Sequence, residues 1–216
     1  MKQLIIYDLD GTLVDTLEDI TCAANHMLRM LQTPGVLARE VRGYIGCGVQ
    51  ELVKRCVKTE DPKRIEYGVS VYRAYYARHM LDQSRLYPGA QAVLDYFKAR
   101  RQAVITNKPN PFSREILTAL GVADYFFEII AGDSAYPKKP DPAAALAIMQ
   151  QAGSHPEETL LIGDSPIDIE TGRRAGVATV GILHGFSDKD ELLAAAPDLL
   201  VRDFAELLQR AKAEVW

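Results

Sequence analysis

Two aspartates come directly after the first apolar run of this chain. The run 4–7 is followed by Asp8, Leu9 and Asp10. A short run rich in β-branched residues predicts a buried strand, and residues i and i+2 of a strand point to the same side. The carboxylates of Asp8 and Asp10 would therefore project together where the strand ends. Because close carboxylates repel each other and lose hydration on burial, this pair indicates a site for a divalent cation.

A second acidic stretch follows the apolar run 159–162 near the other end of the chain. Asp164 ends that run, and Asp168 lies four residues further on, after Pro166. Proline suits the first turn of a helix, so this stretch predicts a strand followed by a helix. Ligands of open α/β sheets bind outside the carboxyl ends of the strands. We therefore expect the two acidic stretches to form one site at one edge of a parallel sheet.

Two further apolar runs, 103–105 and 129–131, precede polar residues that suit a phosphoryl group. The donors that follow these runs are Thr106, Asn107, Lys108, Lys138 and Lys139. Hydroxyl, amide and ammonium groups are the donors that phosphoryl oxygens accept. Because these residues also follow strands, the sequence predicts a phosphoryl-binding site at the same sheet edge as the acids.

The predicted elements fall into two parts. Residues 17–83 contain helices only, at 17–31, 38–44, 49–57 and 62–80, and we interpret this segment as an insertion after the first strand. From residue 88 onward helices and strands alternate, which predicts an α/β fold with a parallel sheet. The expected helices are 90–100, 111–120, 142–152 and 166–175, and the expected strands are 103–106, 127–131, 159–163, 177–182 and 199–201. We predict a core domain of residues 1–16 and 84–216 and a helical domain of residues 17–83.

Composition excludes several classes of partner. The net charge of −4 provides no electrostatic footprint for nucleic acid or an anionic membrane, and we expect neither partner. Cys22, Cys47 and Cys56 lack the spacing of metal ligands and are interpreted as reduced thiols of a cytoplasmic protein. The first apolar run is too short for a signal peptide, and no predicted segment is long enough to span a membrane.

Five stretches of the chain resemble one known family, the haloacid dehalogenase-like phosphohydrolase superfamily. Within that family the chain is most similar to the phosphoglycolate phosphatase branch. The matching stretches are Asp8–Thr16, Leu86–Gly89, Val104–Pro109, Lys139–Pro142 and Gly163–Asp168. The resemblance implies a doubly wound, Rossmann-like parallel sheet with the first strand central. It also implies that the helical insertion is a mobile cap that closes over the site.

The same resemblance assigns roles to the acids. It implies that Asp8 is the nucleophile that forms an aspartyl-phosphate, and that Asp10 is the general acid and base. It further implies a bound Mg²⁺, held by the Asp8 carboxylate, the Asp10 backbone carbonyl and Asp164, with Asp168 bonded through water. Dehalogenases of the family normally lack the second aspartate, so Asp10 disfavours that activity.

The phosphate ligands also follow from the resemblance. We assign binding of the phosphoryl oxygens to Thr106, Asn107 and Lys139. Lys139 is chosen over Lys138 because the family places its lysine directly before a proline. Lys108 has the weaker claim and is interpreted as a turn residue.

Selectivity among phosphate esters is expected to come from the cap, since the core recognises only phosphate and metal. The loop Gly46–Gly48 has glycines that let its backbone approach a ligand, and cations flank it. We assign substrate recognition to Arg42, Gly46 and Lys54, which would meet a substrate carboxylate; an equal alternative is that these cations are solvated. The tyrosines Tyr67, Tyr72, Tyr75 and Tyr76 are interpreted as packing within the cap.

The resulting hypothesis is a Mg²⁺-dependent phosphatase that acts on a small phosphorylated metabolite, with 2-phosphoglycolate first among the candidates, as a monomer or homodimer. Nucleotidase, pyrophosphatase and sugar phosphomutase activities stay open. A phosphonate hydrolase would use a cap lysine such as Lys54 or Lys58. An alternative from a different class is a signalling domain that accepts phosphate without turnover, although such domains are typically shorter and lack a helical insertion.

Overall fold

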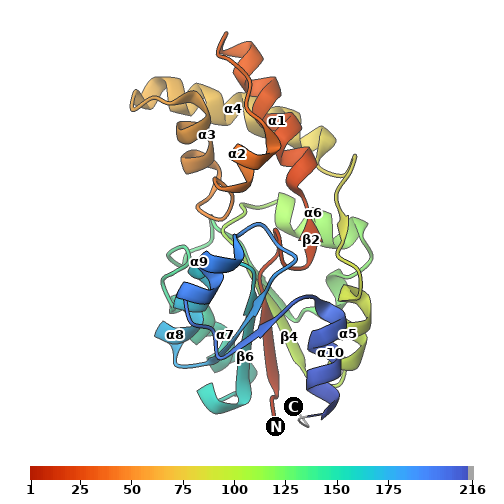
Figure 1. Ribbon diagram of the computed structural model, residues 1–216. Coiled ribbons are helices and arrows are strands. Elements are labelled where there is room, and N and C mark those ends of the chain that lie inside the picture. The colour runs from red at the N-terminus through yellow and green to blue at the C-terminus, as the bar shows by residue number, and fades with distance from the viewer. Residues whose placement is uncertain (214–216) are drawn as a thin grey trace.

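The first strand, β1 (Leu4–Tyr7), lies in the interior of a six-stranded sheet in which all neighbours are parallel. The computed structural model describes residues 1–213 of the chain. The strand order is β5-β4-β1-β6-β7-β8, so β1 lies between β4 and β6 (Figure 1). The other strands of this sheet are β4 (Arg101–Ile105), β5 (Glu128–Ile130), β6 (Thr159–Gly163), β7 (Ala178–Ile182) and β8 (Leu199–Val201).

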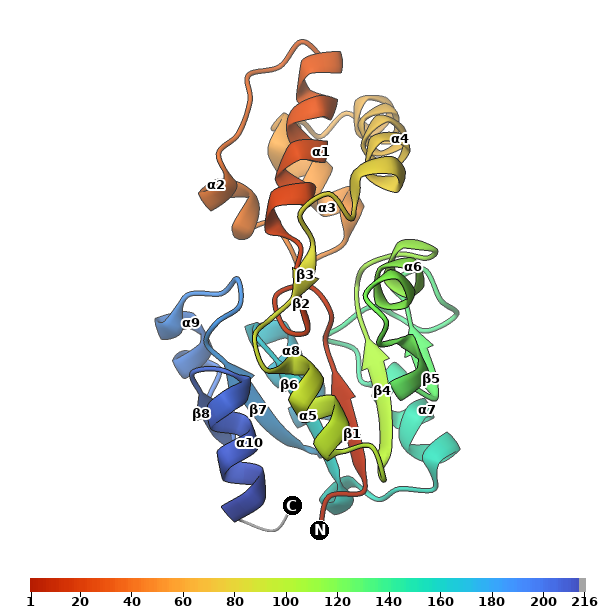
Figure 2. The ribbon, with the colours of Figure 1, turned by 90° about the vertical axis from the view of Figure 1, so that its right-hand side faces the viewer.

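Side chains of β1 alternate between two hydrophobic layers, as expected for a strand buried on both faces. Leu4 and Ile6 pack with residues of α7 (Ala143–Ala152), whereas Ile5 and Tyr7 pack with residues of α5 (Ala90–Tyr96) and α10 (Phe204–Ala213). Helices α7 and α8 (Pro166–Ala175) therefore lie on one face of the sheet, and α5 and α10 on the other (Figures 1 and 2). The predicted doubly wound α/β fold is confirmed.

Some boundaries differ from the sequence-based prediction. The helix expected over 90–100 ends at Tyr96. Strand β4 begins at Arg101, earlier than expected, because Arg101 pairs in parallel register with Leu4 at the start of β1. The remaining helices of the core are α6 (Phe112–Ala119), α9 (Lys189–Ala194) and the 3-10 turns Ala123–Tyr125 and Pro156–Glu158. The prediction did not include the short helix α9.

Four helices form a separate bundle beyond the carboxyl ends of the strands (Figures 1 and 2). Helix α1 packs against the three others in this bundle, which we call the cap. The cap helices are α1 (Leu17–Met30), α2 (Ala38–Arg42), α3 (Val49–Val57) and α4 (Pro62–His79). The segments predicted as helices in this part of the chain are therefore helical. Among residues 1–213, no helix is both long enough and apolar enough to cross a bilayer.

The two connections between cap and core pair with each other. Strands β2 (Val14–Asp15) and β3 (Arg85–Leu86) form a two-stranded antiparallel sheet between the cap and the core (Figure 2). Neither segment is predicted as a strand from the sequence, because two-residue strands leave no periodic signal. The predicted domain boundaries at 16/17 and 83/84 lie next to this small sheet and stay a prediction.

A buried carboxylate links α1 to the two residues directly before β3. Asp19 is 2% exposed, and its carboxylate accepts hydrogen bonds from the backbone N–H groups of Gln83 and Ser84 and from the Ser84 hydroxyl, at 2.7–3.1 Å. We expect Asp19→Asn to lower the free energy of unfolding by about 1.5–3 kcal/mol, because hydrogen bonds to a charged acceptor are lost. Chemical denaturation measures this change. Glu18→Gln, at the exposed neighbouring position, is the matched control; equal stability of the two variants would contradict the expectation.

Candidate active site

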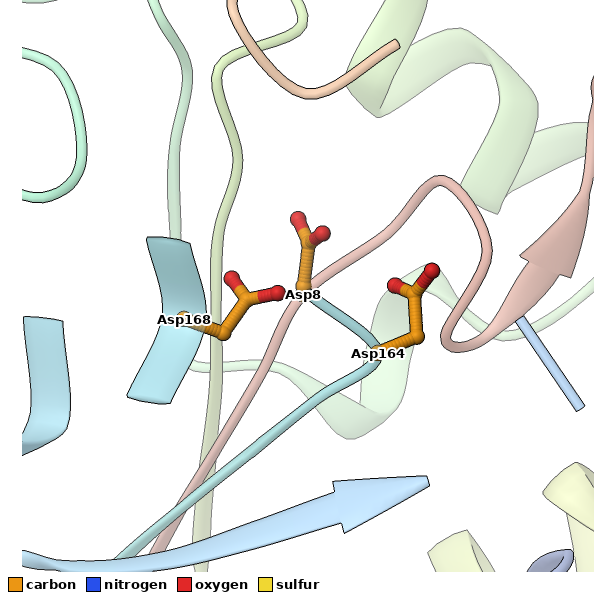
Figure 3. Close-up of side chains that lie close together, drawn as sticks. All are labelled: Asp8, Asp164 and Asp168. Carbon is orange, nitrogen blue, oxygen red and sulfur yellow. The ribbon is translucent and has the colours of Figure 1, made fainter. Parts of the chain in front are cut away.

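Three of the four predicted acids meet at the carboxyl edge of the sheet. Asp8 follows β1, Asp164 follows β6, and Asp168 lies in the first turn of α8; their side chains point toward one another (Figure 3). One carboxylate oxygen from each lies within 4.8 Å of the others, and all three residues are buried. The expectation that the two acidic stretches form one site is therefore fulfilled in the geometry.

Burial makes this cluster of like charges costly. Burial raises the pKa of Asp8 well above its usual range, against the opposing effect of Lys139, and the charges of Asp168 and Asp164 raise it further. Burial, with the charge of Asp168, raises the pKa of Asp164 to about 7. The site therefore favours a cation that neutralises several carboxylates at once.

Lys139 supplies part of that neutralisation. Its Nζ atom lies 2.7 Å from Asp8 Oδ1 and 2.6 Å from Asp168 Oδ1, and its side chain is 4% exposed. Burial alone would lower the pKa of Lys139, but contact with Asp168 and Asp8 raises it above its usual value. One ammonium among three carboxylates leaves an excess of negative charge at the site.

Hydrogen bonds hold the other two carboxylates in place. Asp164 accepts hydrogen bonds from the Thr12 hydroxyl at 2.8 Å and from the Phe186 N–H at 2.7 Å. Asp168 accepts hydrogen bonds from the Ser165 hydroxyl at 2.6 Å and from the Ser165 N–H at 3.1 Å. These contacts also cap the first turn of helix α8. Both acids are thus preorganised by short contacts within the core.

The side chain of Asp10 lies outside the acidic cluster. Its carboxylate is 2.9 and 3.2 Å from Lys108 Nζ and accepts a hydrogen bond of 2.7 Å from the Thr16 hydroxyl. The turn at Gly11, where φ is +86°, directs the chain away after Asp10; a Cβ atom at Gly11 would lie 2.3 Å from Asp164 Oδ2. The turn therefore requires glycine both for its backbone angle and for space.

The predicted phosphate ligands are placed differently from one another. Thr106 and Lys139 line a cavity beside Asp8. The Asn107 amide donates to Gly46 O at 2.7 Å and to Lys139 O at 3.0 Å, and its carbonyl accepts the Lys139 N–H at 2.9 Å. Both amide donors of Asn107 are therefore engaged. In this arrangement the side chain positions Lys139 and the cap loop, and Asn107 lines the same cavity as Thr106 and Lys139. Its assignment as a phosphate ligand stays a prediction.

Two cavities meet at Asp8 and Asp10. The smaller has a volume of about 50 Å³ and lies between cap and core, and the larger has a volume of about 530 Å³. Lys108 lines the smaller cavity, and Asp164 lines the larger one. Gly46 lines both, so the cap loop forms part of each wall.

The cap cations are not arranged as expected. Arg42 lines the larger cavity, but its guanidinium donates to the carbonyls of Phe186 at 2.5 Å and Gly185 at 2.7 Å, so it fastens α2 to the core. Lys54 pairs with Glu60 at 2.8 Å and lines neither cavity. This arrangement therefore does not bring Lys54 to either cavity, as in the alternative of solvated cations, and its assignment to substrate recognition stays a prediction.

Three residues that line the smaller cavity were not predicted as site residues from the sequence. Lys108 is buried against Asp10 rather than in a solvated turn. Tyr72 and Tyr76 line the smaller cavity as well as packing within the cap, whereas Tyr67 is exposed. Their spacing of four residues on α4 places both on one helix face, which was the available signal.

Comparison with known proteins gives a consistent result. Residues 5–182 match the model of a family described as haloacid dehalogenase-like hydrolase. A phosphoglycolate phosphatase of Pseudomonas putida is 35% identical over 217 residues, covering 96% of this chain and 79% of that protein. A phosphoglycolate phosphatase of Vibrio vulnificus strain YJ016 is 34% identical over 218 residues, covering 95% and 94% of the two chains.

The fold is shared with solved structures as well. The crystal structure of a predicted phosphoglycolate phosphatase from Haemophilus somnus 129pt matches with a TM-score of 0.91 and 32% identity, covering 96% of this chain and 97% of that one. The match therefore includes the cap as well as the sheet. The chain belongs to the haloacid dehalogenase-like hydrolases, and within them it is a phosphatase.

Proposed function

We propose that this protein hydrolyses a small phosphate monoester, 2-phosphoglycolate in the first place, with Asp8 as nucleophile and Mg²⁺ as cofactor. The observation that carries the proposal is the convergence of Asp8, Asp164 and Asp168 around Lys139, with the separate acid Asp10 beside them. The names of the relatives support the choice of substrate. Location in the cytoplasm and a monomeric or homodimeric state stay predictions.

The first step is attack on phosphorus by the Asp8 carboxylate. A bond forms between the attacking oxygen and phosphorus, the ester bond breaks, and Asp10 gives its proton to the leaving oxygen. In the second step Asp10 takes a proton from water, which attacks phosphorus and releases phosphate and the Asp8 carboxylate. Lys139 and the Thr106 hydroxyl bind phosphoryl oxygens, on which charge is spread during transfer.

The donor set fits a hard divalent cation. The carboxylates of Asp8 and Asp164 present oxygen atoms, and the site carries uncompensated negative charge, which suits Mg²⁺. Asp168 already accepts hydrogen bonds from Lys139 and Ser165. This favours contact between Asp168 and the cation through water rather than direct ligation. When bound, the cation reduces the repulsion between Asp8 and the anionic substrate.

A panel of phosphate esters tests the proposal. The purified protein is treated with a chelator, and phosphate release is measured with and without added Mg²⁺. The panel includes 2-phosphoglycolate, an aryl phosphate, sugar phosphates, nucleotides and pyrophosphate. Mg²⁺-dependent release with 2-phosphoglycolate as the best substrate is expected. Full activity in the chelator would reject the metal, and absence of release from every ester would reject the function.

The affinity for Mg²⁺ is expected to rise with pH up to about 7. The raised pKa of Asp164, about 7, means that the folded protein holds a proton there that the cation must displace. The same shift stabilises the metal-free protein at low pH, and this contribution is lost as pH rises from the ordinary range of Asp through about 7. The increase in melting temperature on adding Mg²⁺ should therefore be larger near pH 8 than near pH 5.5. Asp164→Asn should weaken this dependence and leave the part due to Asp8, whose pKa burial also raises; an unchanged pH profile in that variant would contradict the assignment.

A further inference from the structure

Lys108 is a buried cation whose charge is directed at the general acid. Its side chain is 5% exposed, and its Nζ atom lies 2.9 Å from Asp10 Oδ1 and 4.6 Å from the centre of the Tyr76 ring. In a site with little water, an ammonium interacts strongly with whichever anion is closest. In the ligand-free protein that anion is Asp10, the residue that must carry a proton to assist the leaving group.

Tyr76 presents an unused hydroxyl in the same place. The residue is 1% exposed, and its hydroxyl has no hydrogen-bond partner among residues 1–213. A buried hydroxyl without a partner costs stability, so its retention here points to a ligand that supplies an acceptor. Tyr72, one helical turn earlier on α4, is also buried and lines the same cavity.

The space beside these groups is small. The cavity of about 50 Å³ has room for only a few water molecules, because one water needs about 10–15 Å³ on the same measure. The carboxylate of Asp10 faces this cavity through its contact with Lys108. The general acid must reach the leaving oxygen. Asp10 also lines the larger cavity, but Lys108 and Tyr76 line only the smaller one, so a leaving group that contacts them extends into the smaller cavity and must be short.

We infer that Lys108 and the Tyr76 hydroxyl bind a carboxylate on the leaving group, so that the protein selects short phosphorylated hydroxy acids. The inference rests on the proposed function and identifies the groups that set its selectivity. Much of the remaining wall is apolar, formed by residues such as Ile20, Leu52 and Phe112. Its further polar residues, such as Thr106, Asn107 and Ser165, carry no charge. Lys108 is therefore the cation that a carboxylate meets once Lys139 holds the phosphoryl group.

This arrangement couples substrate recognition to catalysis. A substrate carboxylate that takes over the Lys108 ammonium releases Asp10 from its ion pair. The Asp10 side chain is then free to turn toward the leaving oxygen. A phosphate ester without a carboxylate leaves the Lys108–Asp10 pair intact and is hydrolysed slowly. Selectivity then resides in the rate of the first step as well as in binding.

The test compares 2-phosphoglycolate with propyl phosphate, whose leaving group has a similar size and no charge. We expect Lys108→Met to lower kcat/KM for 2-phosphoglycolate by about thirtyfold or more, the usual effect of losing a buried charge partner. For propyl phosphate the same variant should show an equal or higher kcat/KM, because Asp10 is no longer paired. A purely structural role for Lys108 would instead lower both values in parallel.

Two further variants sharpen the test. Tyr76→Phe removes only a hydroxyl that lacks a protein partner, so the melting temperature should not fall, while kcat/KM for 2-phosphoglycolate falls by about three- to tenfold. Lys63→Met removes an exposed cap lysine and is the matched control for net charge. It should leave the ratio of the two kcat/KM values unchanged.

The outcomes separate this inference from the proposed function. If the wild-type protein hydrolyses esters with Mg²⁺ but prefers propyl phosphate, or if Lys108→Met leaves the ratio unchanged, the carboxylate subsite is rejected and the phosphatase remains. An equal change of the ratio in Lys63→Met would also reject the subsite, because the effect would follow net charge. Absence of hydrolysis of any ester would reject the proposed function itself.

Discussion

Asp8→Asn should abolish phosphate release, with a loss of at least about 10⁴-fold in kcat, because an amide is a poor nucleophile. No phosphorylated protein should accumulate in this variant under any condition of quenching. Burial raises the pKa of Asp8, so ionised Asp8 adds repulsion to the acidic cluster. Removal of that charge should therefore leave the melting temperature unchanged or higher, which excludes unfolding as the cause of inactivity.

Asp10→Asn is the matched comparison, since it changes the neighbouring acid and keeps the nucleophile. We expect a decrease of about 10²–10⁴-fold, the range for general acid and base assistance. With an aryl phosphate the leaving group needs little protonation, so the first step proceeds while the second is slowed. Acid quenching followed by mass measurement should then detect a phosphorylated protein. Near-normal turnover in Asp8→Asn would show that the covalent route assigned here is wrong.

The second large effect is expected at Lys139. Lys139→Met keeps much of the side-chain volume and leaves the buried carboxylates of Asp8 and Asp168 without their ammonium partner. Breaking a buried ion pair by removing one member costs about 3–5 kcal/mol, so the free energy of unfolding should fall by that amount in metal-free buffer. Turnover should also be lost, because Lys139 is assigned to a phosphoryl oxygen.

A cation should partly rescue the stability of this variant. Mg²⁺ neutralises the same carboxylates, so it should raise the melting temperature of Lys139→Met more than that of the wild-type protein. Lys138→Met, at the exposed adjacent position, controls for the loss of one lysine in this loop. Equal stabilities of the two variants in metal-free buffer would show that Lys139 does not balance the acidic cluster.

The acidic cluster could be predicted from the sequence because it depends on strand geometry alone. Asp8 and Asp164 each follow a short apolar run, and parallel strands bring their carboxyl ends to one edge. Asp168 follows from the helix that begins at Pro166. Periodicity predicts these strands and the helix, and the alternation of helices and strands predicts the parallel sheet. The adjacency of β1 and β6 was not readable from the sequence, because no local pattern encodes strand order.

The residues around the smaller cavity required knowledge of how the cap meets the core. Whether Tyr72 and Tyr76 face other cap helices or the cavity depends on the position of α4 over the sheet, which no local pattern encodes. For the same reason the contact of Asn107 with the cap loop could not be predicted, because its partner Gly46 is 61 residues away. Lys54 shows the converse: a flanking position in sequence did not bring its side chain to either cavity.

The pairing of β2 with β3 has a consequence for how this protein can change. Because the chain leaves and re-enters the core through adjacent paired residues, Val14 with Leu86 and Asp15 with Arg85, an insertion of another length can close the same gap. The entropic cost of closing a loop grows only slowly with its length, so such an exchange changes the stability of the core little. A transplanted cap would bring new tyrosines but would still meet Lys108, which belongs to the core. With the subsite proposed above, substrate preference depends both on the cap and on Lys108 of the core, and exchange of the cap alters only the first contribution.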